Sequence, residues 1–281
     1  MSTELPSIVI DRLVRVALEE DLGGGDVTTE ACIDEEARST AHAVARRAQI
    51  ACGARVAERV FALVDPAVEF HQGPNDGALV DERTTLWSVR GRARSILMAE
   101  RVALNFVQRM AGVATLTRRY VDAVPAGAKT RITDTRKTTP GLRALERFAV
   151  RTGGGKNHRD NLGSAVLIKD NHIAASGGIA EAIARARGRA PHTSKIECEV
   201  DTLQGLEVAI AAGADIVMLD NMSNEQITQA VGIAAGRVFL EASGGITLER
   251  IPALAQTGVD AISVGALTHS AAAMDIGLDF E

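Results

Sequence analysis

The pattern of apolar and polar residues divides this chain into regions of different character. From Ile8 to Glu20 the apolar side chains fall on one stripe and the charged ones off it, which predicts an amphipathic helix. Short runs follow over Ser39–Ala51 and Val68–Arg94, with a helical pattern over Val56–Val64 between them. Because turn signals break the runs, they predict an α+β arrangement with an antiparallel sheet.

A long helical segment begins at Ser95, and we expect a break in it at Gly112. Arg101, Asn105 and Gln108 are spaced i, i+4 and i+7 and therefore share one face of this helix. A solvated face would explain them. An Asn and a Gln in place of the usual Glu and Lys favour a polar contact surface instead.

From Lys129 onward, strand and helix patterns alternate. The predicted strands are Arg131–Asp134, Ala165–Asp170, Lys195–Val200, Asp215–Asp220, Arg237–Ala242 and Asp260–Val264. The predicted helices between them are Leu142–Val150, Leu203–Ala212, Asn224–Ala234 and Leu248–Thr257. Continuous Val, Ile and Leu runs suit parallel strands covered on both faces. With no GxGxxG after any strand, the pattern favours a (β/α) barrel, complete or open, over a doubly wound sheet.

Composition narrows the class of protein. The chain has 281 residues, 46% of them hydrophobic, which allows one large core or two smaller ones, and the change of pattern favours two. Cys32, Cys52 and Cys198 have no regular spacing, so they predict neither a disulfide framework nor a metal quartet. Without a leader pattern or a long apolar stretch, we expect a cytoplasmic protein.

Charge is distributed unevenly along the chain. Between Lys129 and His172 there are ten Lys and Arg against four Asp and Glu, a balance of 10 − 4 = +6 in a chain of formal net charge −5. A nucleic-acid surface needs a broad basic stripe, and aromatic residues for base stacking are only 3% of the chain. A local basic cluster in an acidic protein instead indicates a site for a small anion.

Polar residues end each of the predicted barrel strands. In chain order they are Asp134, Arg136 and Lys137; Lys169 and Asp170; Glu197 and Glu199; Asp220 and Asn221; Glu241 and Ser243; and Ser263 with Gly265. The carboxyl ends of the strands form the reactive face of such a barrel. Charged side chains are rarely buried without a partner, so we expect these residues to form one site.

Glycine-rich turns follow the last two predicted strands, at Ser243–Ile246 and Val264–Leu267. Backbone amides at a helix N-terminus bind phosphate, and the loops after the final strands are its usual place in this architecture. The earlier Gly23–Gly25 has no Lys and no helix immediately after it, so we interpret it as a tight turn.

The residue types imply three ligand groups. An acid is held by Arg and His, one phosphate by the glycine turns, and a second phosphate by Lys with acidic residues nearby for Mg²⁺. This combination predicts transfer of a phosphorylated sugar from a diphosphate donor.

Several segments of the sequence resemble those of a known protein family. The segments EDLGGGDVTT, AERVALNFVQRMAGVAT, TDTRKTTPGLRALERFAVRTGGGKNHRDNL, LIKDNHI, IECEVD, MLDNMS, LEASGGI and DAISVGALTHS resemble the quinolinate phosphoribosyltransferase family. The resemblance implies an N-terminal α/β sandwich domain, placed at 1–112, to which the tail 271–281 returns, and an open, incomplete (β/α) barrel at 113–270. It also implies a homodimer or larger assembly.

The same resemblance implies a role for individual residues. Quinolinate would be bound by Thr135, Arg136, His158, Arg159 and Lys169, with Arg101 entering from the partner subunit. Phosphoribosyl pyrophosphate would be bound by Lys137, Glu199, Asp220, Ser243, Gly244, Gly245, Ser263, Val264, Gly265, Ala266 and His269. The catalytic residues would be Lys137, Lys169, Glu199 and Asp220. Mg²⁺ would bind mainly through the donor phosphates, with Glu199 and Asp220 as candidate ligands. The implied reaction yields nicotinate mononucleotide, pyrophosphate and CO₂ in NAD biosynthesis.

Three alternatives stay open on the sequence. Lys169, among apolar neighbours at a strand end, could form a Schiff base as in a class I aldolase. A paralogue of the same fold, such as those encoded with molybdate transport systems, would act on another acid. A non-enzymatic anion-binding protein is the third.

Overall fold

The computed structural model describes residues 4–281, which separate into two compact units. The first unit comprises residues 4–118, 138–154 and 267–281, and the second comprises 119–137 and 155–266. The expected boundary between residues 112 and 113 therefore differs from the point where the chain first passes between the units. The segment 138–154, which we expected in the barrel domain, groups with the first unit.

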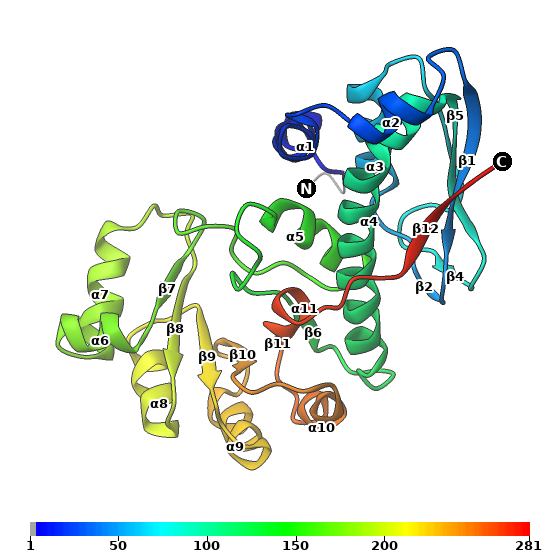
Figure 1. The fold of residues 1–281 in the computed structure, drawn as a ribbon. Helices are drawn as coiled ribbons and strands as arrows, with labels where there is room; N and C mark the ends of the chain where they lie inside the picture. Colours follow the sequence, from blue (N-terminus) through cyan, green and yellow to red (C-terminus); the bar gives the residue numbers. More distant parts are fainter. Residues whose placement is uncertain (1–3) are drawn as a thin grey trace. The chain divides into compact units, whose positions relative to one another are not determined.

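A four-stranded antiparallel sheet forms one side of the first unit (Figure 1). In spatial order its strands are β12 (Ile276–Phe280), β1 (Arg38–Ala45), β5 (Thr85–Arg92) and β3 (Glu69–Gln72). The end of the chain thus adds a strand beside β1, with Ala43 opposite Leu278. Trp87 on β5 stacks on Phe70 of β3, and Phe70 contacts Phe61, which joins the sheet to a helix. These aromatic contacts form part of the core of the unit.

Helices and a small second sheet complete the first unit. The helices are α1 (Ser7–Leu22), α2 (Val27–Cys32), α3 (Ala54–Val64) and α5 (Arg143–Thr152). The small sheet pairs β2 (Gln49–Ile50) with β4 (Leu79–Val80). One expectation was wrong here, because α2 begins directly after the glycine turn, where we expected no helix. Asp26 caps it by accepting a hydrogen bond from the Thr29 amide at 2.9 Å.

The long helix α4 (Ala93–Asp122) is continuous, so the predicted break at Gly112 was wrong. Gly112 has another function in the packing of the first unit. A Cβ atom at this position would overlap the backbone carbonyl oxygen of Ala272. The glycine therefore lets the C-terminal segment pass close to the helix, and the 30-residue helix tolerates its low helix propensity.

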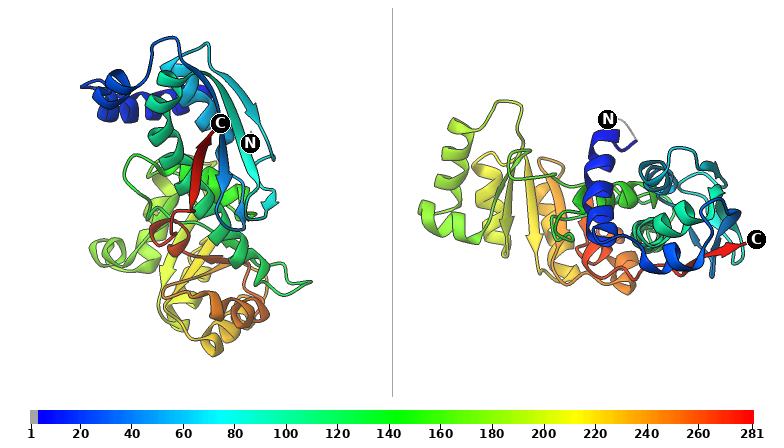
Figure 2. Two further views of the ribbon diagram at one scale, coloured as in Figure 1. Left: turned by 45° about the vertical axis from the view of Figure 1, so that its right-hand side comes forward. Right: turned by 45° about the horizontal axis from the view of Figure 1, so that its top comes forward.

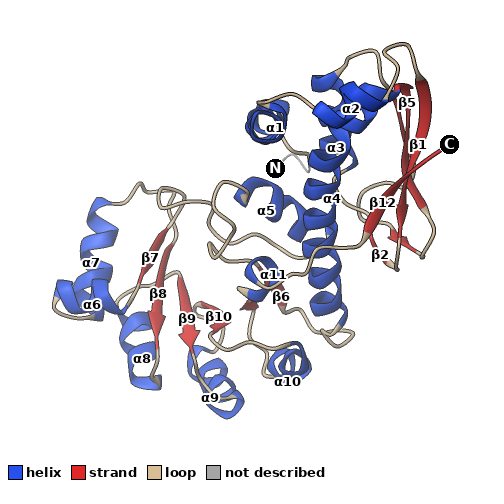
Figure 3. Ribbon diagram, in the orientation of Figure 1, coloured by secondary structure: helices blue, strands red, loops and turns tan. Residues whose placement is uncertain are grey.

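Six parallel strands form the sheet of the second unit (Figure 3). In spatial order they are β6 (Arg131–Thr133), β11 (Ala261–Ser263), β10 (Phe239–Ser243), β9 (Ile216–Asp220), β8 (Ile196–Val200) and β7 (Val166–Ile168). Within residues 4–281, β6 and β7 form no pair with each other, so the barrel is open at this point. The predicted fold class, an α/β sandwich domain and an open (β/α) barrel domain, is confirmed, and all six predicted strands are present.

Helices cover the outer side of the parallel strands (Figure 2). They are α6 (Asp170–Ser176), α7 (Ile179–Arg189), α8 (Leu203–Ala211), α9 (Asn224–Ala234), and the 3₁₀ turn η1 (Leu248–Arg250) with α10 (Ile251–Gln256). The short α11 (Ala266–His269) begins at the last residue of the second unit, and its other residues belong to the first unit. The sequence pattern did not reveal α6 or α7. Buried residues such as Ile183, Leu206 and Ile227 fix the helices against the strands. None of the helices in residues 4–281 combines the length and apolar character needed to cross a membrane.

Candidate active site

A pocket of about 570 Å³ lies in the second unit at the carboxyl ends of the parallel strands. Its lining residues are Thr135, Arg136, Lys137, His158, Arg159, Leu167, Lys169, Glu199, Met218, Asp220, Asn221, Glu241, Ser243, Gly244, Gly245 and Ser263. Basic residues, acidic strand ends and one glycine turn, predicted separately, therefore meet in one cavity. From the sequence, we expected the polar strand-end residues to form one site, and those named here do lie in one pocket.

The basic side of the pocket depends on a segment that runs beside β6. The amide of Lys156 donates to the Ile132 carbonyl at 2.8 Å, and the amide of Asp134 donates to the Lys156 carbonyl at 3.1 Å. The fully buried carboxylate of Asp134 then accepts hydrogen bonds from the His158 amide at 2.7 Å and from Asn157 Nδ2 at 2.6 Å. These bonds explain how a loop residue, His158, takes a fixed place at the pocket.

Arg159 is fixed at both its backbone and its side chain. Its amide donates to Nδ1 of His158 at 2.8 Å, and its Nη1 donates to the Ala165 carbonyl at 3.2 Å. Burial and the neighbouring guanidinium of Arg136 lower the pKa of Arg159, and the charge of Glu197 partly offsets this effect. Both guanidinium groups line the same pocket, where together they attract a dianion.

Three largely buried ionisable side chains form a cluster next to the pocket, and we call it the His–Glu–Glu cluster. Nε2 of His158 lies 3.1 Å from Oε2 of Glu197 on β8 and 3.5 Å from Oε1 of Glu241 on β10. Burial alone would lower the pKa of His158, but the hydrogen bond to Glu197 and the charge of Glu241 raise it. Burial raises the pKa of Glu241 to about 7, with a further contribution from the charge of Glu197.

The His–Glu–Glu cluster also has the spacing of a metal site, because one ligand atom from each residue lies within 4.8 Å of the others. The hydrogen bonds of the imidazole argue against a metal there. Since Nδ1 of His158 accepts the Arg159 amide proton, the ring proton must be on Nε2, which would have to bind the metal. Nε2 instead donates to Glu197.

The acidic side of the pocket is formed by Glu199 on β8 and Asp220 at the end of β9. Glu199 forms an ion pair with Lys169. Asp220 accepts a hydrogen bond from Nδ2 of Asn221 at 2.7 Å, and the amide of Asn221 donates to the Ser243 carbonyl at 3.0 Å. Carboxylate oxygens at this position have the chemistry that a hard cation such as Mg²⁺ requires.

The glycine turn after β10 is the part of the predicted phosphate site that lines the pocket. Gly244 has a φ of +85°, and a Cβ atom there would overlap the side chain of Asn221. A residue with a side chain is therefore excluded, and the backbone of the turn is open to a ligand. Ser263 also lines the pocket, whereas Val264, Gly265 and Ala266, which follow it, are not among the lining residues.

Two residues predicted for the site belong to the first unit. Arg101 is exposed on α4, with Glu100 at 4.0 Å as a charged neighbour. His269 is exposed at the end of α11, and its Nδ1 lies 2.7 Å from Oγ of Ser270. Their roles in substrate binding stay predictions. On the same face of α4 as Arg101, Gln108 does form a polar contact, because its Nε2 donates to the Ile276 carbonyl at 2.8 Å.

Four pocket residues were given no role from the sequence: Leu167, Met218, Asn221 and Glu241. Asn221 and Glu241 had a sequence signal, since both end predicted strands. Leu167 and Met218 had none, because apolar strand residues in a barrel are usually core. Only the register that aligns Met218 with both Glu199 and Glu241 brings it to the pocket.

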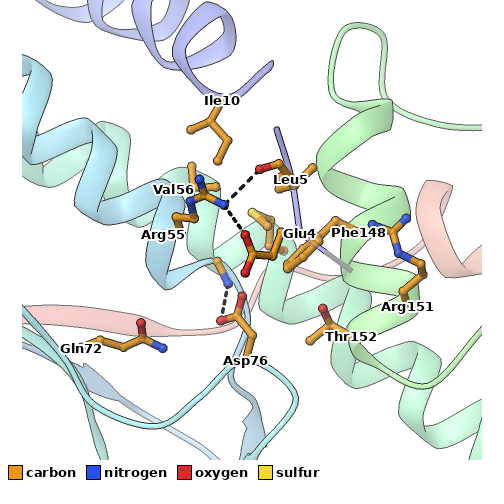
Figure 4. Close-up of a pocket in the computed structure, with 12 residues that line it drawn as sticks. Glu4, Leu5, Ile10, Arg55, Val56, Gln72, Asp76, Phe148, Arg151 and Thr152 are labelled. Carbon is orange, nitrogen blue, oxygen red and sulfur yellow. Dashed lines mark hydrogen bonds and ion pairs between the residues drawn. The ribbon is translucent and has the colours of Figure 1, made fainter. Parts of the chain in front are cut away.

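A second pocket, of about 470 Å³, lies in the first unit (Figure 4). Arg55 there bonds to Glu4 at 3.1 Å and to the Leu5 carbonyl at 3.2 Å. Asp76 accepts the Gly53 amide at 3.0 Å, at the N-terminus of α3. Glu4, Arg55 and Asp76 thus bind each other or the backbone, and Arg151 lies over the Phe148 ring, so we assign no reaction to this pocket.

Comparison with family models identifies both parts of the chain. Residues 26–111 match the model described as quinolinate phosphoribosyl transferase, N-terminal domain, and residues 113–279 match the C-terminal domain of the same family. Together the two models cover most of the chain.

Individual proteins give the same result. The chain is 44% identical over 260 residues to the probable nicotinate-nucleotide pyrophosphorylase (carboxylating) of Bacillus subtilis, covering 92% of this chain and 89% of that protein. It is 44% identical over 274 residues to the nicotinate-nucleotide pyrophosphorylase (carboxylating) of Mycobacterium leprae, covering 95% of each. The crystal structure of NadC from Streptococcus pyogenes superposes with a TM-score of 0.95 at 43% identity, covering 100% of both chains.

Proposed function

The chain belongs to the quinolinate phosphoribosyltransferase family, and we propose that the pocket of its second unit performs the reaction for which its relatives are named. The protein is a decarboxylating pentosyltransferase of NAD biosynthesis. It transfers the phosphoribosyl group of phosphoribosyl pyrophosphate to quinolinate and releases pyrophosphate and CO₂.

The observation that carries this function is the composition of the pocket. Its lining combines a set of guanidinium and ammonium groups with a second set of carboxylates and a glycine turn. The first set suits an aromatic diacid, and the second suits a sugar phosphate that develops positive charge at its anomeric carbon. A cavity of about 570 Å³ is within the usual range for binding small molecules.

On the acceptor side, we assign quinolinate to Thr135, Arg136, His158, Arg159 and Lys169. The neighbouring guanidinium groups of Arg136 and Arg159 support this assignment, because a planar guanidinium forms two parallel hydrogen bonds with a carboxylate. Adjacent carboxylates on one ring need adjacent cations.

On the donor side, we assign phosphoribosyl pyrophosphate to Lys137, Glu199, Asp220, the turn Ser243–Gly245 and Ser263–Ala266, with His269 near the phosphate. Glu199 and Asp220 provide hard oxygen donors, so the residues of the pocket fit a Mg²⁺ ion bound mainly through the donor phosphates. When bound, Mg²⁺ supplies positive charge that neutralises the departing pyrophosphate.

The chemistry then follows from the charges in the pocket. The bond between the sugar C1 and the pyrophosphate oxygen breaks, and its electron pair leaves with pyrophosphate next to Lys137. Glu199 and Asp220 stabilise the cationic sugar. The pyridine nitrogen of quinolinate donates its lone pair to C1 and becomes quaternary. The cationic ring accepts the electron pair released as the 2-carboxylate leaves as CO₂, and a solvent proton completes the ring.

Positioning, more than proton transfer, accounts for catalysis in this scheme. Neither substrate needs a general base before the pyridine nitrogen attacks, so the pocket must hold the nitrogen and C1 in line. The fixed loop 156–159 and the strand ends supply this rigidity. We further propose a dimer in which Arg101 of one subunit completes the acceptor site of the other.

The Schiff-base alternative is disfavoured by the surroundings of Lys169. Its side chain is 45% exposed and pairs with Glu199. A Schiff-base lysine is typically desolvated in an apolar pocket, whereas this side chain is half exposed and lies beside a carboxylate.

The proposal is tested by a spectrophotometric assay with quinolinate, phosphoribosyl pyrophosphate and Mg²⁺, run beside nicotinate as the alternative acceptor. We expect a mononucleotide to form with quinolinate and CO₂ to be released in equal amount. Turnover of nicotinate but not quinolinate would reassign the acceptor. No mononucleotide from either acid would leave a non-enzymatic anion-binding protein as the better description.

A further inference from the structure

We propose that Glu197 is a positioning residue for the acceptor acid: with Glu241, it fixes the His158 ring, and the ring in turn fixes the backbone of Arg159. This inference rests on the proposed function. Glu197 itself is not among the residues that line the pocket, and its side chain is 5% exposed, so it acts through His158 and not by touching a substrate.

The first support is the convergence of three carboxylates on one loop residue. Asp134 follows β6, Glu197 is on β8 and Glu241 is on β10, which are alternate strands in the order β6-β11-β10-β9-β8-β7. In barrels, side chains from alternate strands form one interior layer, which is usually filled by branched apolar residues. Here the carboxylates hold His158 at its backbone amide and at Nε2.

The second support is the direction of the hydrogen bonds around the imidazole. The Arg159 amide donates to Nδ1, so Nε2 carries the ring proton and donates it to Glu197 at 3.1 Å. The chain Glu197–His158–Arg159 is therefore directional, and each member fixes the next. Turning the ring over would place Nδ1 away from the Arg159 amide and would break both contacts at once.

The third support is the cost of this arrangement. Oε1 of Glu197 is buried without a hydrogen-bond partner, and Oε1 of Glu241 has only the charge contact with Nε2 of His158 at 3.5 Å. Buried carboxylates with unsatisfied oxygens destabilise a fold, and apolar residues of similar size would fill the same space at lower cost. The cluster therefore serves the pocket above it more than the stability of the barrel.

Arg159 links the cluster to the acceptor acid. Arg159 and Arg136 line the same pocket, and the charge of Glu197 acts on the Arg159 guanidinium. The Ala165 carbonyl holds one end of the guanidinium and the His158 ring holds the backbone. A shift of the loop would thus misplace a cation that the proposed function assigns to a quinolinate carboxylate.

The test is Glu197→Gln in the full-length enzyme, with initial rates measured against each substrate in turn. Because glutamine keeps the shape but loses the charge that holds the ring, we expect the KM for quinolinate to rise about tenfold. We expect kcat and the KM for phosphoribosyl pyrophosphate to change by less than about twofold. Glu241→Gln, whose oxygen is farther from the ring, should shift the same KM less.

Asp215→Asn is the matched control. Asp215 accepts the Ile196 amide at 2.8 Å near the amino ends of the strands, away from the pocket. We expect Asp215→Asn to lower the stability of the protein and the fraction of active enzyme. The KM values for quinolinate and for phosphoribosyl pyrophosphate should stay unchanged. The nitrogen NMR spectrum of the wild type provides a readout without a variant, and should show the proton of His158 on Nε2.

The outcomes separate the two proposals. Wild type without quinolinate turnover removes the proposed function and this inference together. Wild type with turnover, and Glu197→Gln with unchanged KM for quinolinate, overturns the inference alone. A His158 ring protonated only at Nδ1 also overturns it, whatever the kinetics show.

Discussion

Lys169 and Glu199 form an ion pair across the ends of β7 and β8, neighbouring parallel strands at the pocket. The pair joins a residue assigned to the acceptor acid to one assigned to the donor. On the proposed assignment, a carboxylate of quinolinate competes with Glu199 for the Lys169 ammonium, which couples the two substrates through these side chains.

Glu199→Gln should accordingly separate binding from catalysis. We expect kcat to fall about 10²- to 10³-fold, because a carboxylate that stabilises the cationic sugar is lost. Quinolinate affinity should stay the same or increase, since Lys169 is released from its partner. Steady-state rates and calorimetry measure the two effects. Glu207→Gln on the exposed face of α8 is the control, and loss of quinolinate binding in Glu199→Gln would contradict the assignment.

Arg136→Ala should abolish quinolinate binding yet leave binding of phosphoribosyl pyrophosphate largely intact. The proposed function assigns the guanidinium groups of Arg136 and Arg159 to the adjacent carboxylates of quinolinate and assigns the donor to the acidic strand ends. Titration calorimetry with each substrate checks this. Arg131→Ala, at the opposite end of β6 where Arg131 lies 6.0 Å above the Phe239 ring, should affect neither titration. Unchanged affinities for both substrates in Arg136→Ala would refute the assignment.

Gly244→Ala should weaken donor binding and destabilise the protein. A left-handed residue with a side chain costs about 1–3 kcal/mol, and here the added Cβ also overlaps Asn221. The KM for phosphoribosyl pyrophosphate and the melting temperature report these effects. Gly236→Ala is matched, because Gly236 also has a positive φ, +74°, but has open space around it. If Gly244→Ala and Gly236→Ala changed the KM for phosphoribosyl pyrophosphate equally, backbone strain alone would explain the effect.

Gly112→Ala should destabilise the protein. The sign of the change in the free energy of unfolding distinguishes a packing role of Gly112 from a role as a helix breaker. If Gly112 only weakened the helix, alanine would stabilise it by about 1 kcal/mol. Because the added Cβ would overlap the Ala272 carbonyl, we expect destabilisation by about 1–3 kcal/mol instead. Chemical denaturation gives the free energy of unfolding. Gly232→Ala on α9, with nothing near its Cβ position, should show the stabilising sign.

The pH dependence of stability should depend on Glu241. Its pKa is raised from 4.5 to about 7 in the fold, by burial and by the charge of Glu197, with Asp134 adding to the shift and His158 opposing it. The contribution of Glu241 to the free energy of unfolding is fully present below about pH 4.5 and is lost as the pH rises through about 7. The raised pKa of His158 acts in the same direction.

Glu241→Gln removes a titrating group, so its melting temperature should fall less steeply than that of the wild type between pH 5 and 8. Thermal unfolding by circular dichroism at several pH values measures both slopes. Parallel curves for the two proteins would contradict a raised pKa at Glu241.

The sequence by itself determined the elements and most of the site. Hydrophobic periodicity identified the six barrel strands, because a parallel strand covered on both faces requires a continuous apolar run. The chemistry of the site was equally visible, since Arg136, Lys169, Glu199 and Asp220 each follow or end such a run. The carboxyl ends of parallel strands share one edge, so position along the chain was enough to bring them together.

Only the tertiary structure decided contacts between residues distant in the chain. From the sequence, Gly112 was interpreted as a helix break. The residue that explains this glycine, Ala272, is 160 residues away along the chain, so no local pattern could indicate the contact. The pairing of Glu197 and Glu241 with His158 depends on which strands alternate around the sheet and on the register between them. Local sequence fixes backbone preference and burial, whereas the direction of a hydrogen bond depends on the atoms that folding brings within reach.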